Sequence, residues 1–495
     1  MSSNKLIARF ATPGAALALI AVSFGMARYP TLPKEECAAL AERFKFQKLG
    51  FPEVENHPPY KYVRNVHPSL KRIESWVSTL GASVEMVDLD GDGLPNDVCY
   101  VDPRTDLVTV APVPGTGERY KPFTLSPSPL PYDAVTTAPM GVLAGDFNED
   151  GLMDVLVYFW GRTPVLYLRK GNATPGQARA LAADDYVQTE LSDSGERWFS
   201  NGAVMADLDG DGHVDLVIGN YFQDGAHILD PNAGGVEVLH EGKSKALNGG
   251  KKHLFLWEGG IGGDHPTAKY AEARGVLDQA VEHGWCLAIG AADLDGDLLP
   301  EIYFGHDFGP DRLLHNLSTP GHLKFQVLQG VRHFRDPKSC VLGFDSFKGM
   351  GVDFGDINGD GIPDIYVSNI ATKYGLTESH FLWQSTGNLE QMKNGIAPYE
   401  QASEKLGLSR SGWGWDCRLA DFDNDGVLEA MQAVGFIKGK INRWPELQSL
   451  GTSNDRIVHD PRLWPNFRPG ADLSGHDLDP FFVRAADGRY YDIGP

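Results

Sequence analysis

Short apolar runs recur along most of the chain, and polar turn residues bound each of them. The clearest runs are Val155–Val157, Leu216–Ile218, Ile302–Phe304 and Ile365–Val367. Second runs follow at Val165–Leu168, His253–Leu256, Arg312–Leu314, His380–Trp383 and Phe481–Val483, and third ones at Lys324–Val327, Pro398–Glu400 and Arg489–Asp492. Runs this short, rich in β-branched and aromatic residues, are typical of buried strands. The pattern predicts an all-β chain in which about four strands form one unit of ~60 residues.

One acidic motif precedes the first run of each unit and occurs six times. It places side-chain oxygens at positions 1, 3, 5 and 9. In chain order these positions hold Asp88, Asp90, Asp92 and Asn96; Asp146, Asn148, Asp150 and Asp154; Asp207, Asp209, Asp211 and Asp215; Asp293, Asp295, Asp297 and Glu301; Asp356, Asn358, Asp360 and Asp364; and Asp421, Asp423, Asp425 and Glu429. The first positions lie 58, 61, 86, 63 and 65 residues apart, so the motif is an internal repeat.

The spacing of these oxygens suits Ca²⁺, which takes six to eight oxygen ligands at about 2.3–2.6 Å. An EF-hand is excluded because it needs an acidic residue at position 12. That position holds Cys99, Val157, Ile218, Phe304, Val367 and Gln432. We therefore predict about six Ca²⁺ sites in loops that join two strands. The fourth loop is the weakest candidate, because Leu298 stands where the other five loops have glycine.

The acidic loops also account for the charge of the protein, which has 66 Asp and Glu residues against 44 Lys and Arg, a net charge of −22. All but three of the 24 oxygen positions in the loops are carboxylates. Such a charge argues against nucleic acid and against anionic lipid as partners. The five cysteines have no CxxC spacing, and no catalytic triad, phosphate loop or HExxH motif is present. No catalytic residue is predicted, and enzymatic activity is not the expected function.

A four-stranded unit that recurs in this way is a propeller blade. The acidic loops resemble those of the FG-GAP (VCBS) repeat family, which builds the propellers of integrin α-chains. Three segments resemble most closely the bacterial relatives of cartilage acidic protein, namely Phe308–Arg312, Lys348–Gly351 and Ser411–Cys417. The resemblance implies an exported propeller with seven blades, although six motifs are present. We favour seven blades, with Lys61–Ser83 completing the ring; a six-bladed ring is the alternative.

The N-terminus has the pattern of a targeting segment. Lys5 and Arg9 precede an uncharged stretch whose most apolar part, Gly14–Met26, suits the core of a signal peptide. Residues 1–27 are thus a signal peptide or a membrane anchor formed by residues 10–27. Residues 28–58 form a linker with a short helix at Pro33–Lys48, and 59–495 form the propeller. We expect export to the periplasm, the cell surface or the medium, with membrane contact only through an uncleaved N-terminal segment.

Two insertions interrupt the repeat, at Gln223–Lys252 and at Lys438–Asp479. The second contains Trp444, Trp464 and Phe467, which either anchor a partner from the surface or turn inward and seal the last blade. A further group of tryptophans, Trp285, Trp413 and Trp415, is expected to pack between blades. The leading hypothesis is a calcium-binding scaffold that binds a protein or a glycan. The alternatives are a propeller enzyme acting on polysaccharide and an accessory subunit of a membrane complex.

Overall fold

The computed structural model describes residues 3–79, 81–172, 179–346, 348–372, 375 and 378–494. These residues form an all-β propeller, as the repeat predicts, with six four-stranded antiparallel sheets as blades. Blades 1 to 3 are β1 (Ser83–Val87), β2 (Asp97–Asp102), β3 (Leu107–Pro112), β4 (Phe123–Thr124); β5 (Ala138–Gly145), β6 (Asp154–Trp160), β7 (Val165–Arg169), β8 (Tyr186–Glu190); and β9 (Ser200–Ala206), β10 (Asp215–Asn220), β11 (Lys252–Ile261), β12 (Thr267–Glu272). Blades 4 to 6 are β13 (Trp285–Ala292), β14 (Glu301–Asp307), β15 (Arg312–Asn316), β16 (Phe325–Leu328); β17 (Val352–Gly355), β18 (Asp364–Val367), β19 (Phe381–Ser385), β20 (Tyr399–Gln401); and β21 (Gly414–Ala420), β22 (Glu429–Val434), β25 (Phe481–Arg484), β26 (Tyr490–Asp492).

The seven-bladed layout favoured by the sequence is not the one that the described residues form. Lys61–Ser83 does not supply an additional blade, because most of it folds into the 3₁₀-helix η1 (Pro68–Ile73) and the short helix α3 (Glu74–Val77). Leu70, Ile73 and Val77 recur at the three- to four-residue spacing of a helix, and all three are buried. The six-bladed alternative therefore describes the ring.

Each blade has the same orientation along the ring axis. In blade 4, β13 pairs with β14 from Trp285↔Asp307 to Ala292↔Glu301. The acidic loop between these strands is thus at one end of the hairpin, while Trp285 and Asp307 are at the other end, about 20 Å away at ~3.3 Å per residue. We refer to the end with the acidic loops as the loop end and to the opposite end as the cap end.

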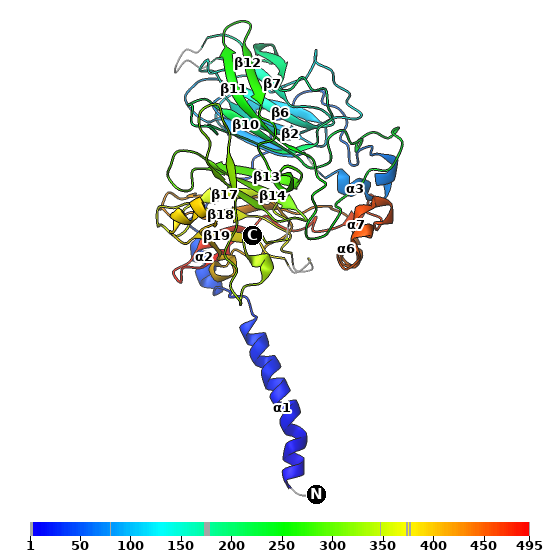
Figure 1. Cartoon of the computed structure of the whole chain (residues 1–495), viewed down its shortest axis with the longest axis vertical. Coiled ribbons are helices and arrows are strands. Elements are labelled where there is room, and N and C mark those ends of the chain that lie inside the picture. Colours follow the sequence, from blue (N-terminus) through cyan, green and yellow to red (C-terminus); the bar gives the residue numbers. More distant parts are fainter. Residues whose placement is uncertain are drawn as a thin grey trace.

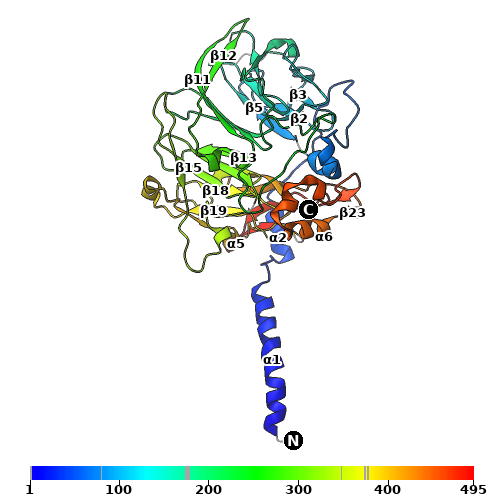
Figure 2. The same ribbon diagram turned by 45° about the vertical axis from the view of Figure 1, so that its right-hand side comes forward.

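Three segments distant in sequence cover the cap end and are joined by backbone hydrogen bonds. They are residues 66–79, the insertion 221–251 and the insertion 437–479 (Figures 1 and 2). The last contains β23 (Ile441–Asn442), α6 (Trp444–Gly451), α7 (Asp455–His459), η5 (Pro461–Leu463) and β24 (Ala471–Asp472). The amide of His67 donates to Ile228 O (2.8 Å), that of Leu239 to His459 O (2.9 Å) and that of Phe467 to Arg72 O (2.8 Å). These segments together form the cap.

In the described chain, the first and last blades share no strand, so other contacts close the ring. Residues 43–61, which we call the strap, run from blade 6 to blade 1. Phe44 and Phe46 pack edge-on against Phe481 of blade 6, with ring centroids 4.9 and 5.0 Å away. The strap then reaches blade 1, where Phe51 packs on the ring of Tyr100 at 4.8 Å.

Two helices precede the strap. Helix α1 (Ser3–Met26) extends away from the propeller, and α2 (Lys34–Ala41) lies near blade 6 (Figures 1 and 2). The helix expected at Pro33–Lys48 is therefore real but ends at Ala41, before the two phenylalanines of the strap. Among the described residues, no helix combines the length and the apolar character required to span a bilayer. The remaining short helices are η2 (Ala183–Asp185), α4 (Gln279–Glu282), η3 (Lys338–Cys340), η4 (Leu389–Asn394) and α5 (Ser403–Leu406).

Candidate functional site

The six acidic loops share one backbone conformation. In every loop the aspartate at position 1 accepts a hydrogen bond from the backbone N–H at position 6, over 2.7–3.0 Å. In loop 3 the carboxylates of Asp207, Asp209 and Asp215 bring ligand atoms within 4.8 Å of one another. Carboxylates that converge in this way around a tight turn fit a hard cation such as Ca²⁺. Carboxylate ligand atoms converge in the same way in loops 1, 4 and 6.

The last acid of each loop begins the second strand of the blade, and its side chain is buried. Asp154 accepts backbone hydrogen bonds from Phe147 (3.0 Å) and Arg169 (2.7 Å). Burial nevertheless raises the pKa of Asp154 to about 8, and it raises the pKa of Glu301 in loop 4 to about 8 as well. A bound divalent cation favours the ionised form of such carboxylates.

Loop 1 is one residue longer than the others, and sequence reasoning missed its buried acid. Asp97, not Asn96, begins β2 and accepts the backbone N–H of Leu89 (2.8 Å), as Asp215 accepts that of Leu208 (3.0 Å) in loop 3. Counting back from the start of the strand, rather than forward from the first aspartate, identifies Asp97. Asn96 instead donates to Asp92 Oδ2 over 2.9 Å.

Arginine side chains occupy two of the loops. In loop 1 the guanidinium of Arg119 pairs with Asp90 (3.1 Å) and Asp92 (2.9 Å), and also with Asp97. In loop 6, Arg43 of the strap donates from Nε to Asp423 Oδ2 (2.7 Å) and pairs with Asp425. A guanidinium among these carboxylates supplies positive charge where a cation would otherwise sit. Loops 1 and 6 are therefore poorer candidates for Ca²⁺ than loops 2, 3 and 5.

Loop 4 keeps the shared conformation although it lacks the glycine. Leu298 adopts φ +74°, close to the φ of +92° at Gly212 in loop 3. A leucine in this left-handed region carries a strain of about 1–2 kcal/mol. The loop also faces a side chain from outside it, because His315 Nε2 of β15 lies 3.3 Å from Asp295 Oδ2.

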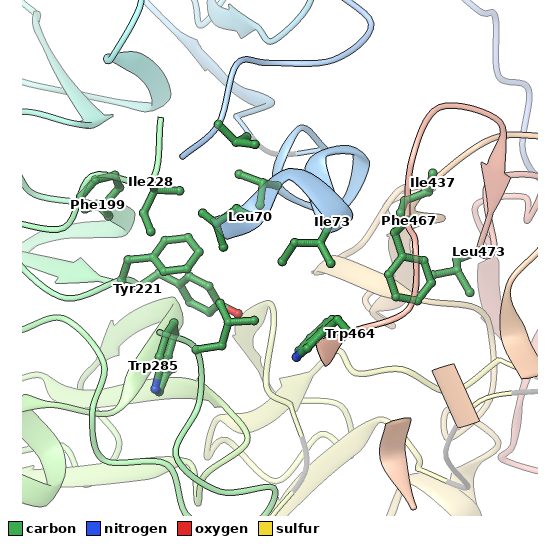
Figure 3. Packing of buried hydrophobic residues seen from close by; sticks show 14 of the residues in the cluster. Leu70, Ile73, Phe199, Tyr221, Ile228, Trp285, Ile437, Trp464, Phe467 and Leu473 are labelled. Carbon is green, nitrogen blue, oxygen red and sulfur yellow. The ribbon is translucent and has the colours of Figure 1, made fainter. Parts of the chain in front are cut away.

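The cap end encloses a small aromatic cavity of about 70 Å³. Its lining includes Trp76 and Trp464 from the cap and Trp413 and Trp415 from the start of β21, and Figure 3 shows Trp464 and Tyr221 in this region. Trp76 packs edge-on against Trp413 (5.6 Å) and Trp464 (5.3 Å). The three sequence segments that resemble the cartilage acidic protein relatives also converge here, through Phe308, Lys348, Trp413 and Trp415.

Charged groups lie in the wall of this cavity. Asp307 Oδ2 accepts a hydrogen bond from Tyr221 (2.6 Å) and is 3.2 Å from His240 Nε2. Burial opposes ionisation of Asp307, but the nearby charge of His240 and the hydrogen bonds from His240 and Tyr221 outweigh it and lower the pKa of Asp307. Lys348 forms an ion pair with Glu378. An acid–base pair in an apolar chamber is a candidate for proton transfer.

A second pocket opens at the rim of the cap end, beside blades 3 and 4, and encloses about 530 Å³. Polar residues line most of it: Glu196, Arg197, Gln223, Asp224, Asn248, Lys251 and His283. Asp224 Oδ1 accepts a hydrogen bond from Asn220 (2.7 Å), while its buried Oδ2 lies 3.8 Å from Nε2 of the buried His253. This pocket, which we call the rim pocket, therefore combines hydrogen-bond donors, acceptors and charged side chains.

The structure of the cap decides between the two roles predicted for its aromatic residues, which are contact with a partner and inward packing. Trp444, Trp464 and Phe467 are buried and turn inward, so the insertion does not present them to a partner (Figure 3 labels Trp464 and Phe467). Trp285 and Trp413 are buried as expected, although Trp413 and Trp415 also line the aromatic cavity. All five cysteines are free thiols.

The comparisons with known proteins agree with the repeat. Residues 293–367 match the model of the FG-GAP-like repeat, from the first aspartate of loop 4 to the last residue of β18. No curated protein sequence matches the chain. Solved structures with similarity include the exotype rhamnogalacturonan lyase YesX, at 16% identity over 72% of this chain and 45% of that one, with a TM-score of 0.25.

Two further structures illustrate how distant these similarities are. The aldose sugar dehydrogenase of Streptomyces coelicolor in its PQQ-bound form is 14% identical over 77% of this chain and 91% of its own, with a TM-score of 0.31. The V. cholerae biofilm matrix protein Bap1 is 10% identical over 72% and 74%, with a TM-score of 0.26. The chain spans less than half the length of the lyases that it matches. Similarities at this level carry no argument about function.

Proposed function

We propose that this chain is an exported, calcium-binding propeller that acts as a binding module for a glycan. Its two ends have separate tasks. Ca²⁺ in loops 2, 3 and 5 fixes the first hairpins of blades 2, 3 and 5, and the cap end presents the rim pocket to the ligand. The observation that carries the proposal is an open pocket of about 530 Å³ that is lined mostly by polar and charged side chains, Asp224 among them.

The metal part of the proposal rests on the donor chemistry of the loops. Loops 2, 3 and 5 place carboxylate or amide side chains at the ligand positions, and no arginine forms an ion pair with these positions in the described chain. In loop 3 the ligand atoms lie within 4.8 Å of one another. Aspartate and asparagine oxygens are the ligands that Ca²⁺ prefers. A cation that binds only the folded protein stabilises it by about 2.7 kcal/mol per site at a concentration 100 times its Kd.

The glycan part rests on the lining of the rim pocket. Sugar hydroxyls both donate and accept hydrogen bonds, so they match a mixture of carboxylate, amide and cationic side chains. Asp224 and Glu196 accept, Arg197 and Lys251 donate, and Asn248 does both. A ligand hydroxyl that donates to the Asp224 carboxylate forms a charge-assisted hydrogen bond, which is stronger than a neutral one.

Oligosaccharide-array screening followed by calorimetry tests the ligand. We expect binding to the purified propeller to weaken at least tenfold in Asp224→Asn, which removes the charge but keeps the size. Asp264→Asn is the matched control, because Asp264 is exposed and lies outside the pocket. Binding that is equal in both variants, or a protein ligand with no glycan binding, contradicts the assignment. Metal analysis of the dialysed protein tests the Ca²⁺ sites separately.

A second candidate function, an enzyme acting on polysaccharide, is favoured by the Asp307–His240 pair in the aromatic cavity. Its test is release of reducing ends from polysaccharides by the wild type and by His240→Gln. Loss of such activity in the variant supports the enzyme, whereas no activity in either protein supports a binding module. Export is tested by fractionation of cells, with residues 1–27 acting as the signal peptide or as an anchor.

A further inference from the structure

His315 distinguishes loop 4 from the other acidic loops. The residue after it, Asn316, donates its backbone N–H to Glu301 (3.2 Å). The equivalent donors to the last loop acid are Arg169 in blade 2, Trp257 in blade 3 and Ser385 in blade 5. The positions equivalent to His315, one residue before each donor, therefore hold Leu168 in blade 2, Leu256 in blade 3 and Gln384 in blade 5. Only blade 4 among these four carries an imidazole at this position.

The imidazole of His315 is directed at the carboxylates of loop 4. Nε2 lies 3.3 Å from Asp295 Oδ2, and ligand atoms of Asp295, Asp297 and His315 all lie within 4.8 Å of one another. The side chain is 3% exposed, and its Nδ1 has no hydrogen-bond partner. Burial of a polar imidazole is costly unless it serves a partner, and Nε2 is the nitrogen that faces the carboxylates. The burial of the His315 side chain is an observation separate from the acidic cluster itself.

We propose that loop 4 binds a divalent transition metal such as Zn²⁺, with His315, Asp295 and Asp297 as ligands. Imidazole nitrogen suits Zn²⁺ and its neighbours in the first transition row, whereas Ca²⁺ is a hard cation held by oxygen ligands. One nitrogen and two carboxylates leave a further position for water or another carboxylate. The proposal rests on the proposed function, because it assumes that the loops are metal sites and changes only the metal of loop 4.

The rival account also comes from this structure. Arg119 neutralises loop 1 from outside the loop, and a protonated His315 could do the same for loop 4. The two accounts differ in what removal of the imidazole does. A metal ligand is lost in the first, so transition-metal affinity falls. A competing cation is lost in the second, so affinity for any divalent cation rises.

Zn²⁺ titration of chelator-treated protein by calorimetry separates these accounts. His315→Gln is the test variant, because blade 5 carries Gln384 at the equivalent position. His213→Gln is the matched control: His213 is half-buried at position 7 of loop 3 and contacts Glu149 outside that loop (2.8 Å). Melting of each variant, measured first, verifies that it is folded.

We expect the wild type and His213→Gln each to bind one Zn²⁺ ion more tightly than any other Zn²⁺ ion that the protein binds. This binding should weaken in His315→Gln by more than the roughly 10–100-fold that loss of an outer-shell partner costs. The ligand-field spectrum of the Co²⁺-loaded protein should change in His315→Gln alone. Unchanged or tighter Zn²⁺ binding in His315→Gln overturns the proposal. Ca²⁺ titration of the same variant reports loops 2, 3 and 5, so failure of the calcium assignment is seen separately.

Discussion

Replacement of Asp97 by alanine tests the internal neutralisation of loop 1. The Asp97 carboxylate is 0% exposed and accepts hydrogen bonds from the amides of Leu89 (2.8 Å) and Asp90 (2.9 Å) and from the Tyr120 hydroxyl (2.7 Å). It also pairs with Arg119. Alanine leaves two buried amides and a guanidinium without this acceptor. The loss should therefore be large, whether or not a metal is present.

The magnitude follows from these contacts. Removal of one partner of a buried ion pair costs about 3–5 kcal/mol. Arg119 is 17% exposed and keeps Asp92 at 2.9 Å, which places the ion-pair loss at the lower end of this range. Each buried donor left without an acceptor adds about 1–3 kcal/mol, and the cost given above for breaking the ion pair already includes part of this. We expect the free energy of unfolding to fall by about 4 kcal/mol.

Denaturant unfolding followed by tryptophan fluorescence measures this loss, with excess chelator and with Ca²⁺. Asn96→Ala is the control, because Asn96 is the ligand that the sequence predicts and its hydrogen bond to Asp92 is worth about 0.5–1.5 kcal/mol. An equal or larger loss in Asn96→Ala refutes the assignment of Asp97. A loss in Asp97→Ala that appears only with Ca²⁺ refutes neutralisation by Arg119.

Three further predictions concern the cap, the strained loop and the pH dependence. Phe467→Ala should cost about 3–5 kcal/mol in denaturant unfolding, because Phe467 is 0% exposed within the cap. Leu298→Gly should raise the free energy of unfolding by about 0–1 kcal/mol, as measured by thermal melting. The Leu298 side chain is 84% exposed, and the relief of backbone strain exceeds the entropic cost of glycine. The folded pKa of Asp154 and of Glu301 is raised to about 8, above the unfolded values of about 4. Between these pH values the folded state holds more protons, so without metal the melting temperature should fall as pH rises from about 4 to 8, and excess Ca²⁺ should reduce this slope.

The sequence predicts the parts of the fold that depend on neighbouring residues. The acidic loops and the strands beside them are local patterns, so β6, β10, β14 and β18 follow their motifs as expected. The error at Asn96 arises because one extra residue in loop 1 shifts the buried acid without changing the motif. Arg119 and Arg43 escape sequence reasoning for another reason. Arg119 lies more than twenty residues after the aspartates that it contacts, and Arg43 lies near the opposite end of the chain from loop 6. No spacing rule connects either arginine to its loop.

The blade count shows how ring closure depends on contacts of this non-local kind. In the described chain, blade 1 takes all its strands from β1 to β4 and blade 6 takes none from the N-terminus, so no shared sheet holds the two together. The residues expected to supply a further blade close the seam by packing instead. Trp76 of the cap contacts Trp413 of blade 6, while Arg64 pairs with Asp106 of blade 1 over 2.6 Å. Outside the ring, the strap makes the same connection between Phe481 and Tyr100. Because apolar packing and an ion pair need only proximity, these segments close the ring without strand pairing, and no strand periodicity in the sequence reveals the closure.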